Sequence, residues 1–99
     1  MSDYYILDGH TPVPVEMMRW AKWFETADRK VAVTMVGDIK ISTVFLGLDH
    51  SFGHGPPLLF ETMIFGGPHD EDMARYSTWD EAEAGHNKVV ESVKQGGGL

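Results

Sequence analysis

The sequence contains no cysteine, and this absence removes several classes of function at once. Disulfide bonds, thiolate nucleophiles and cysteine-based zinc or iron–sulfur sites are all excluded. Long apolar runs are also missing, so no segment is predicted to span a bilayer. The first residues, MSDYYILDGHTP, show no basic stretch followed by an apolar run, which a signal peptide would have. We therefore expect a cytoplasmic protein with no membrane partner.

Basic residues are scarce as well. The chain holds 8 Lys and Arg residues against 15 Asp and Glu residues, a formal net charge of −7. Binding to the phosphates of DNA or RNA needs clustered cations, so we expect no nucleic-acid partner. The acidity is first of all a source of solubility, and it also suits a basic surface on a partner protein. The phosphate-loop pattern G-x-x-x-x-G-K-[ST] is missing too, and we expect no cofactor.

The remaining composition is that of a small globular protein. Of the 99 residues, 42% are hydrophobic and 23% are charged, which suits one domain with a modest core. We assign residues 1–95 to a single α+β domain. Residues 96–99, GGGL, are expected to form a flexible glycine-rich tail.

The first third of the chain predicts one strand and one helix. Residues 4–7 form a short aromatic and aliphatic run that predicts a strand. Residues 10–14, HTPVP, contain two prolines that we expect to prevent regular structure. Apolar side chains then recur at intervals of three and four over residues 15–27, which predicts a helix. The strand has two possible places, at the edge of a sheet or against another subunit.

The middle of the chain predicts a β-hairpin. Residues 31–36 and 39–48 are rich in β-branched side chains, and Gly37-Asp38 between them suits a two-residue turn. The more apolar face of this hairpin should cover the core. That face pairs Val36 with Ile39, Thr34 with Ile41 and Ala32 with Thr43, whereas the other pairs Met35 with Lys40 and Val33 with Ser42. Around residues 44–46 both faces become apolar, which predicts a central strand covered on both sides.

The last third predicts a third strand and a second helix. Residues 58–65 alternate as a strand does, and Gly66-Gly67-Pro68 stops them before a polar loop at residues 69–72. Thr78 and Glu81 have the spacing of a helix capping box, with Ser77 and Asp80 as the alternative. The predicted order β-α-β-β-β-α indicates an α+β fold, in which two helices pack on an antiparallel sheet of three to four strands.

The long connection at residues 49–57, DHSFGHGPP, is the first candidate site. Hairpin loops usually run about 2–5 residues, so this excess length suggests a function. The side chains of Asp49, His50 and His54 offer ligands that suit zinc or another divalent ion. Their spacing on a loop does not make them converge, so we expect solvated histidines and no metal site. His50 and His54 are the candidate ligands if a metal does bind.

Two further residues are unusual for their positions. His86 lies on the apolar stripe of the last helix, and we expect a core histidine with one hydrogen-bond partner. Its neighbour Gly85 costs about 1 kcal/mol against alanine in a helix, so it suggests the close approach of a backbone or a ligand. Glu61 interrupts an apolar strand and needs a partner, such as Arg75 or a loop histidine, unless its face is exposed or forms an interface.

No catalytic residue can be assigned, because no nucleophile has a base and an orienting group in a recognisable arrangement. We expect any site to lie between the long loop, Glu61 and the start of the last helix. The candidate ligand-binding residues are Asp49, His50, Phe52, His54, Glu61 and His86.

The runs STVFLGLDHSFGHGPPLLFETMIFGG and RYSTWDEAEAGH resemble a group of small proteins encoded by tailed phages and prophages. The resemblance extends from YYILDG to TWDEAEAGH and so covers most of the chain. It implies a phage origin and action in the host cytoplasm, and it supplies no catalytic residues. Small accessory proteins of phages often bind a host protein or a small signalling molecule.

Three functions are therefore kept open. The first is non-enzymatic binding of a host protein or a small ligand, with a homo-oligomer as a possible state. The second is a metal-dependent hydrolase that uses Asp49, His50 and His54. The third is a structural or assembly component of the phage particle.

Overall fold

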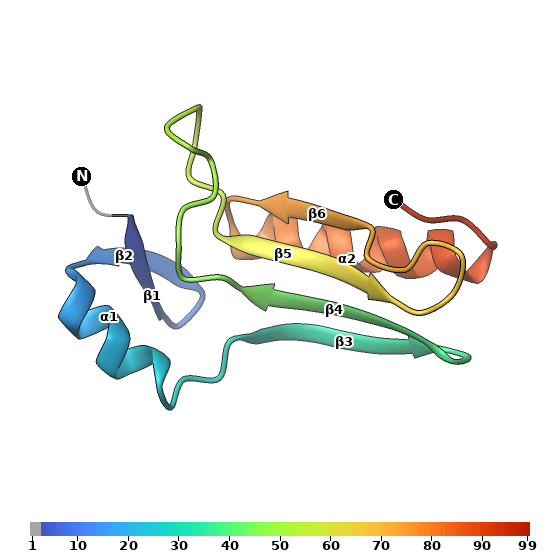
Figure 1. Ribbon diagram of the computed structural model, residues 1–99, viewed down its shortest axis with the longest axis horizontal. Helices are drawn as coiled ribbons and strands as arrows, with labels where there is room; N and C mark the ends of the chain where they lie inside the picture. The colour runs from blue at the N-terminus through green and yellow to red at the C-terminus, as the bar shows by residue number, and fades with distance from the viewer. Residues whose placement is uncertain (1–2) are drawn as a thin grey trace.

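The computed structural model describes residues 3–99, which form a main sheet, a separate hairpin and two helices (Figure 1). The elements in chain order are β1 (Tyr4–Asp8), β2 (Thr11–Val15), α1 (Met17–Phe24), β3 (Lys30–Val36), β4 (Ile39–Phe45), β5 (Phe60–Phe65), β6 (Met73–Tyr76) and α2 (Trp79–Lys94). Neither helix within residues 3–99 is long and apolar enough to cross a membrane.

Strands β3 to β6 form the main sheet, in which each strand pairs antiparallel with the next one along the chain. The turn between β3 and β4 is the predicted two-residue connection, where Gly37 has a φ of 58° that glycine adopts without strain. The predicted register is confirmed from Val36 opposite Ile39 to Ala32 opposite Thr43. The prediction of an α+β fold with an antiparallel sheet is therefore confirmed.

Helix α2 covers one face of the main sheet and runs along its strands (Figure 1). Val89, Val90 and Val93 of this helix pack on Ile41 and Ile64 of the sheet, and all five side chains are buried. Fully burying one such side chain contributes roughly 1.5–3 kcal/mol, so this contact is a principal source of stability.

A second buried cluster lies at the end of the sheet where β4 stops and β5 starts. It joins Phe45, Leu59 and Phe60 to Ala82 of α2. The Phe45 and Phe60 rings lie 5.2 Å apart, and Trp23 meets Phe45 edge-on at 5.8 Å. Through Trp23 the cluster therefore connects α1 to the main sheet.

The start of α2 is fixed by a cap and by a ring contact. The predicted capping box is confirmed: Glu81 N donates to Thr78 Oγ1 at 3.1 Å, and Thr78 N donates to Glu81 Oε1 at 3.1 Å. His10, from the turn between β1 and β2, stacks on Trp79 with ring centroids 3.7 Å apart. This stacking ties the hairpin to the beginning of α2.

Strand β2 contradicts the prediction that two prolines prevent regular structure at residues 10–14. In this hairpin Tyr5 lies opposite Pro14 and Leu7 lies opposite Pro12. Tyr5 N points away from β2 and donates to Gly47 O at 2.9 Å, so the opposite proline faces the outer edge of β2. Proline is tolerated at such an edge because its missing N–H has no ladder partner to lose.

The place of the first strand is thereby settled within the described residues. Strand β1 pairs with β2 on one side and meets the segment that follows β4 on the other. Asp49 N donates to Asp3 O at 3.0 Å, beside the bridge between Tyr4 and Leu48. The strand joins neither edge of the main sheet and is already paired within one chain.

Helix α1 is shorter than the predicted span of residues 15–27. It starts at Met17 because Glu16 caps it: the Glu16 carboxylate accepts from Met18 N at 3.0 Å and from Arg19 N at 2.6 Å. It ends at Phe24. The helix packs mainly against β1, so the two predicted helices do not share the main sheet equally.

Strand β6 was not predicted, and two predicted strands are shorter than expected. The four residues of β6 are too few for alternation to be recognised, and they follow a turn in which Glu71 has a φ of 71°. The strand predicted at residues 39–48 ends at Phe45, and the one predicted at 58–65 begins at Phe60.

The face of the main sheet opposite α2 is not covered by any part of residues 3–99 (Figure 1). The prediction that residues 44–46 are covered on both sides is therefore wrong for a single chain: Phe45 is buried, but Val44 and Leu46 are only half-buried. The strand register defines this open face as the side chains of Lys30, Val33, Met35, Lys40, Ser42, Val44, Glu61, Met63, Phe65, Met73 and Arg75.

Candidate functional site

The long loop between β4 and β5 projects beyond the end of the main sheet (Figure 1). Its base is held by backbone bonds, because Leu46 N donates to Leu59 O at 2.7 Å and His50 N donates to Leu58 O at 3.0 Å. The loop is therefore anchored at its base and projects at its tip.

Asp49 organises this base. One oxygen, Oδ1, accepts from Ser51 N at 2.8 Å and from Leu58 N at 3.0 Å, which joins the two sides of the loop. Burial alone raises the pKa of Asp49, but these hydrogen bonds outweigh burial, and the pKa lies below its usual value. The carboxylate is thus held ionised for a structural task.

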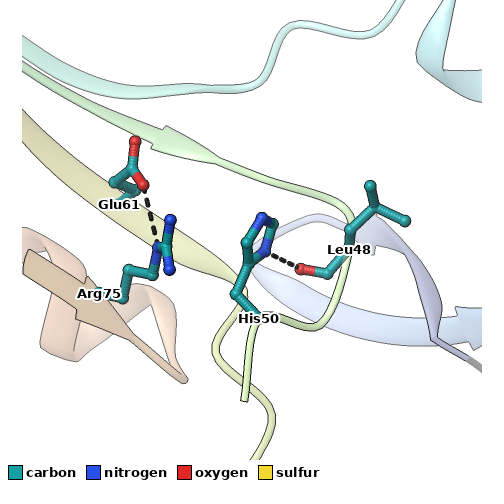
Figure 2. Close-up of polar contacts among 4 residues, drawn as sticks. All are labelled: Leu48, His50, Glu61 and Arg75. Carbon is teal, nitrogen blue, oxygen red and sulfur yellow. Dashed lines mark hydrogen bonds and ion pairs between the residues drawn. The ribbon is translucent and has the colours of Figure 1, made fainter. Parts of the chain in front are cut away.

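The loop histidines do not form a metal site with Asp49. His50 Nδ1 donates to Leu48 O at 2.9 Å, which fixes the ring beside its own backbone (Figure 2). His54 is exposed near the tip. Among residues 3–99, no group of three or more His, Cys, Asp or Glu side chains is placed to hold a metal ion.

Phe52 is a large apolar residue exposed at the tip of the loop. Its side chain is 83% exposed, and its backbone has a φ of 55°, a left-handed conformation that is rare for an aromatic residue. Glycines follow it at positions 53 and 55, both also at positive φ. The tip is a tight turn that presents one large apolar side chain to solvent.

Glu61 has the partner that the sequence suggested. Its Oε2 accepts from Arg75 Nε at 3.0 Å, across the neighbouring strands β5 and β6 (Figure 2). The Glu61 side chain is only 14% exposed even though it lies on the open face. Neighbouring side chains therefore enclose this ion pair, and Arg75 neutralises the only acid of that face.

His86 is a core residue, as predicted, but it has two polar partners and not one. Its side chain is 2% exposed between α2 and the main sheet. Nδ1 lies 2.7 Å from Thr43 Oγ1, and Nε2 lies 2.8 Å from Thr34 Oγ1. Thr43 Oγ1 continues the chain to Thr62 Oγ1 at 2.5 Å.

This chain of hydroxyls satisfies a neutral imidazole. Burial lowers the pKa of His86 below its usual value, so the ring is uncharged at neutral pH. One ring nitrogen then donates and the other accepts, and the threonine hydroxyls rotate to match. The arrangement is a satisfied polar network inside the core.

The structure does not bring the six candidate ligand-binding residues together. Asp49, His50, Phe52 and His54 belong to the projecting loop. Glu61 lies on the open face, whereas His86 lies beneath the opposite face of the same strands. The candidates therefore mark three separate places in the molecule.

A groove beside β6 was missed by sequence reasoning. It consists of two adjoining hollows of about 470 Å³ and 460 Å³ between β6 and α2, and Tyr76, Gly85 and Lys88 line both. Leu58, Arg75, Ser77 and Glu81 line the first hollow, which lies between the loop base, the partner of Glu61 and the start of α2. None of the six candidate ligand-binding residues lines either hollow.

Gly85 was the sequence signal for this groove. A Cβ atom at position 85 would lie only 2.4 Å from atoms of the Tyr76 ring, so the ring rests directly on the helix backbone. The close approach suggested by this glycine is thus made by a side chain of the same protein. The position of the ring between the two hollows could not be predicted, because β6 itself was not.

Comparison with protein-family models, curated proteins and solved structures gives no match for this chain. The resemblance to phage-encoded proteins stays a prediction, and function has to be inferred from the residues themselves.

Proposed function

We propose that this chain is a small non-enzymatic binding protein that holds an extended segment of a host protein in the groove between β6 and α2. The observation that carries the proposal is the Tyr76 ring, which packs against Gly85 and lines both hollows. An aromatic floor between two hollows suits a peptide whose side chains enter both.

The position of the groove supports a peptide ligand. Strand β6 is an edge strand of the main sheet, and such strands offer backbone groups to an added segment. The groove walls combine apolar side chains, such as Leu58 and Val89, with the charged groups of Arg75, Glu81 and Lys88. Arg75 is paired with Glu61, so Lys88, which lines both hollows, is the cation that favours an acidic residue in an otherwise apolar segment.

The resemblance to phage-encoded proteins favours a host protein as the partner. An accessory phage protein that works in the host cytoplasm meets host proteins, and this supports a host segment as the ligand. The hydrolase alternative has less support, because Asp49 Oδ1 already accepts two backbone hydrogen bonds and His50 Nδ1 donates to its own loop.

Selection of peptides from a random library on the immobilised protein tests this proposal. Selected peptides should bind Lys88→Glu at least about tenfold more weakly than the original protein, equivalent to about 1.4 kcal/mol. Lys94→Glu is the matched control, since it makes the same change on the same helix outside the residues that line the groove. Peptides that bind both variants equally well, or a library that yields no binder, would contradict the proposal.

A further inference from the structure

The open face of the main sheet concentrates apolar side chains that one chain leaves in water. Among residues 3–99, eight large hydrophobic side chains are exposed, and four of them lie on this face. They are Val33, Met35, Phe65 and Met73. Apolar groups gathered in this way, unlike single exposed ones, mark an interaction surface.

These side chains form a continuous patch. In the central row Val33, Ser42, Met63 and Met73 lie side by side across all strands of the main sheet. The next row places Met35, Lys40 and Phe65 side by side. Side chains opposite each other on adjacent strands are about 5 Å apart, so neighbours within a row touch, and only Ser42 and Lys40 interrupt the apolar side chains.

The open face also differs from the rest of the molecule in charge. It carries three cations, Lys30, Lys40 and Arg75, and one anion, Glu61, which gives +2, whereas the whole chain carries −7. Arg75 is paired with Glu61, and Lys40 Nζ lies 5.5 Å from the centroid of the Phe65 ring. The single acid of each face, Glu61, is paired, and the unpaired acids lie on other surfaces. Two such faces can therefore meet without the repulsion that the acidic surfaces would cause.

The size of the face is sufficient for a weak but specific contact. Strands about 4.8 Å apart and about six residues long, at about 3.3 Å per residue, give the face a flat footprint of roughly 400 Å². Two such footprints together give roughly 800 Å², to which the projecting side chains add accessible area, so the contact belongs with the small interfaces of weak, transient complexes. We therefore expect an association that is reversible on dilution.

From the apolar patch, its single paired acid and its footprint we infer that the open face is covered by the open face of a second copy of this chain. The two sheets pack face to face about 10 Å apart and are related by a two-fold axis, as in a β-sandwich. The layers then run helix, sheet, sheet, helix. Val44 then becomes buried, as expected for a part of the strand that is covered on both faces. The groove beside β6 of each chain stays on the outside of the dimer.

Sedimentation equilibrium over a range of protein concentrations tests this inference. The original protein should change from 11.1 kDa at low micromolar concentration to twice that mass at high micromolar concentration. The double variant Met35→Glu with Met73→Glu should stay a monomer throughout. Its fold should persist, because these side chains are 58% and 45% exposed in one chain.

Met18→Glu is the matched control, because Met18 is 70% exposed on α1 and lies outside the open face. This variant should associate as the original protein does. An original protein that stays monomeric, or a double variant that associates normally, would overturn the inference. A monomeric protein that loses a different partner only in the double variant would assign the face to that partner.

A distance measurement identifies the associating face without disturbing it. The chain has no cysteine, so Asn87→Cys on the exposed side of α2 gives one attachment point for a spin label. Face-to-face packing of the sheets places the two α2 helices about 30 Å apart, on the outside of the dimer. A separation near 10 Å would mean that the helices pack together, and it would refute the inference.

Discussion

The two faces of the main sheet are built from the same strands, and successive residues alternate between them. On the covered face, Ile41, Thr43 and Ile64 are fully buried beneath α2. On the open face, Met35 and Phe65 are exposed although they are equally apolar. The comparison shows that apolar character alone does not tell which face forms the core of a single chain.

The difference between the faces lies in what α2 supplies. It brings a valine stripe and one histidine whose polar groups are satisfied by threonines of the covered face. The open face has no such partner among residues 3–99, and the only ion pair on it joins Glu61 to Arg75. The covered face therefore stabilises the fold of one chain, whereas association is our proposal for the open face.

The largest expected effect is a difference between the two faces in their contribution to the free energy of unfolding. Phe60→Ala removes a fully buried ring of the covered face and should lower the free energy of unfolding by about 3–5 kcal/mol. Met35→Ala on the open face should change it by less than about 0.5 kcal/mol when the protein is monomeric. Urea unfolding at low protein concentration measures both, and similar losses would remove the distinction.

The next effect concerns the polar network of the covered face. Thr43→Val keeps the shape of the side chain but leaves His86 Nδ1 and Thr62 Oγ1 without their partner, which should cost about 1–3 kcal/mol. Ser42→Val, one residue away on the open face, is the matched control and should cost little. Equal effects of the two changes would show that the network contributes nothing.

The third prediction is a pH dependence that arises only on the covered face. The pKa of His86 is lowered by burial, so the unfolded chain takes up a proton that the folded chain does not. The free energy of unfolding should therefore be highest above about pH 6.5 and fall below it, with a slope of at most about 1.4 kcal/mol per pH unit.

Urea unfolding between about pH 7.5 and about pH 5.5 measures this slope. The variant His86→Gln cannot titrate and should lose it, even though it starts from a lower stability. The variant His54→Gln changes an exposed loop residue and should keep the slope. A slope that survives in His86→Gln would assign the pH dependence to another group.

The smallest effect tests the ion pair on the open face. A double-mutant cycle with Glu61→Gln and Arg75→Gln should give a coupling of about 1 kcal/mol, because both side chains are partly enclosed. The exposed pair between Glu91 and Lys94, at 3.5 Å, is the control and should couple by less than about 0.5 kcal/mol. A larger coupling in the exposed pair would contradict this ranking.

The fold could be predicted where local patterns were strong. Glycine at position 37 and the alternation around it determined the register of β3 and β4, and Thr78 with Glu81 marked the start of α2. Strand β2 was missed because prolines were read as breakers, whereas their position on a free edge makes them harmless. Strand β6 was missed because four residues give too short a signal.

The candidate site was harder to predict, because it depends on which distant segments meet. The pairing of Glu61 with Arg75 was among the alternatives, since both were visible as charges near apolar strands. The two threonine partners of His86 lie on β3 and β4, and the helix sequence does not indicate which strand residues it will contact. The groove could not be predicted, because β6 forms one of its walls and was itself not predicted.

The most direct test of the account follows the methionine methyl groups by NMR as the protein is diluted. Met35, Met63 and Met73 lie on the open face, whereas Met17 and Met18 lie on α1 and serve as internal controls. The account predicts concentration-dependent shifts for the first three signals and constant shifts for the α1 pair. Constant signals from the open face up to high micromolar concentration, or shifts confined to α1, would contradict it.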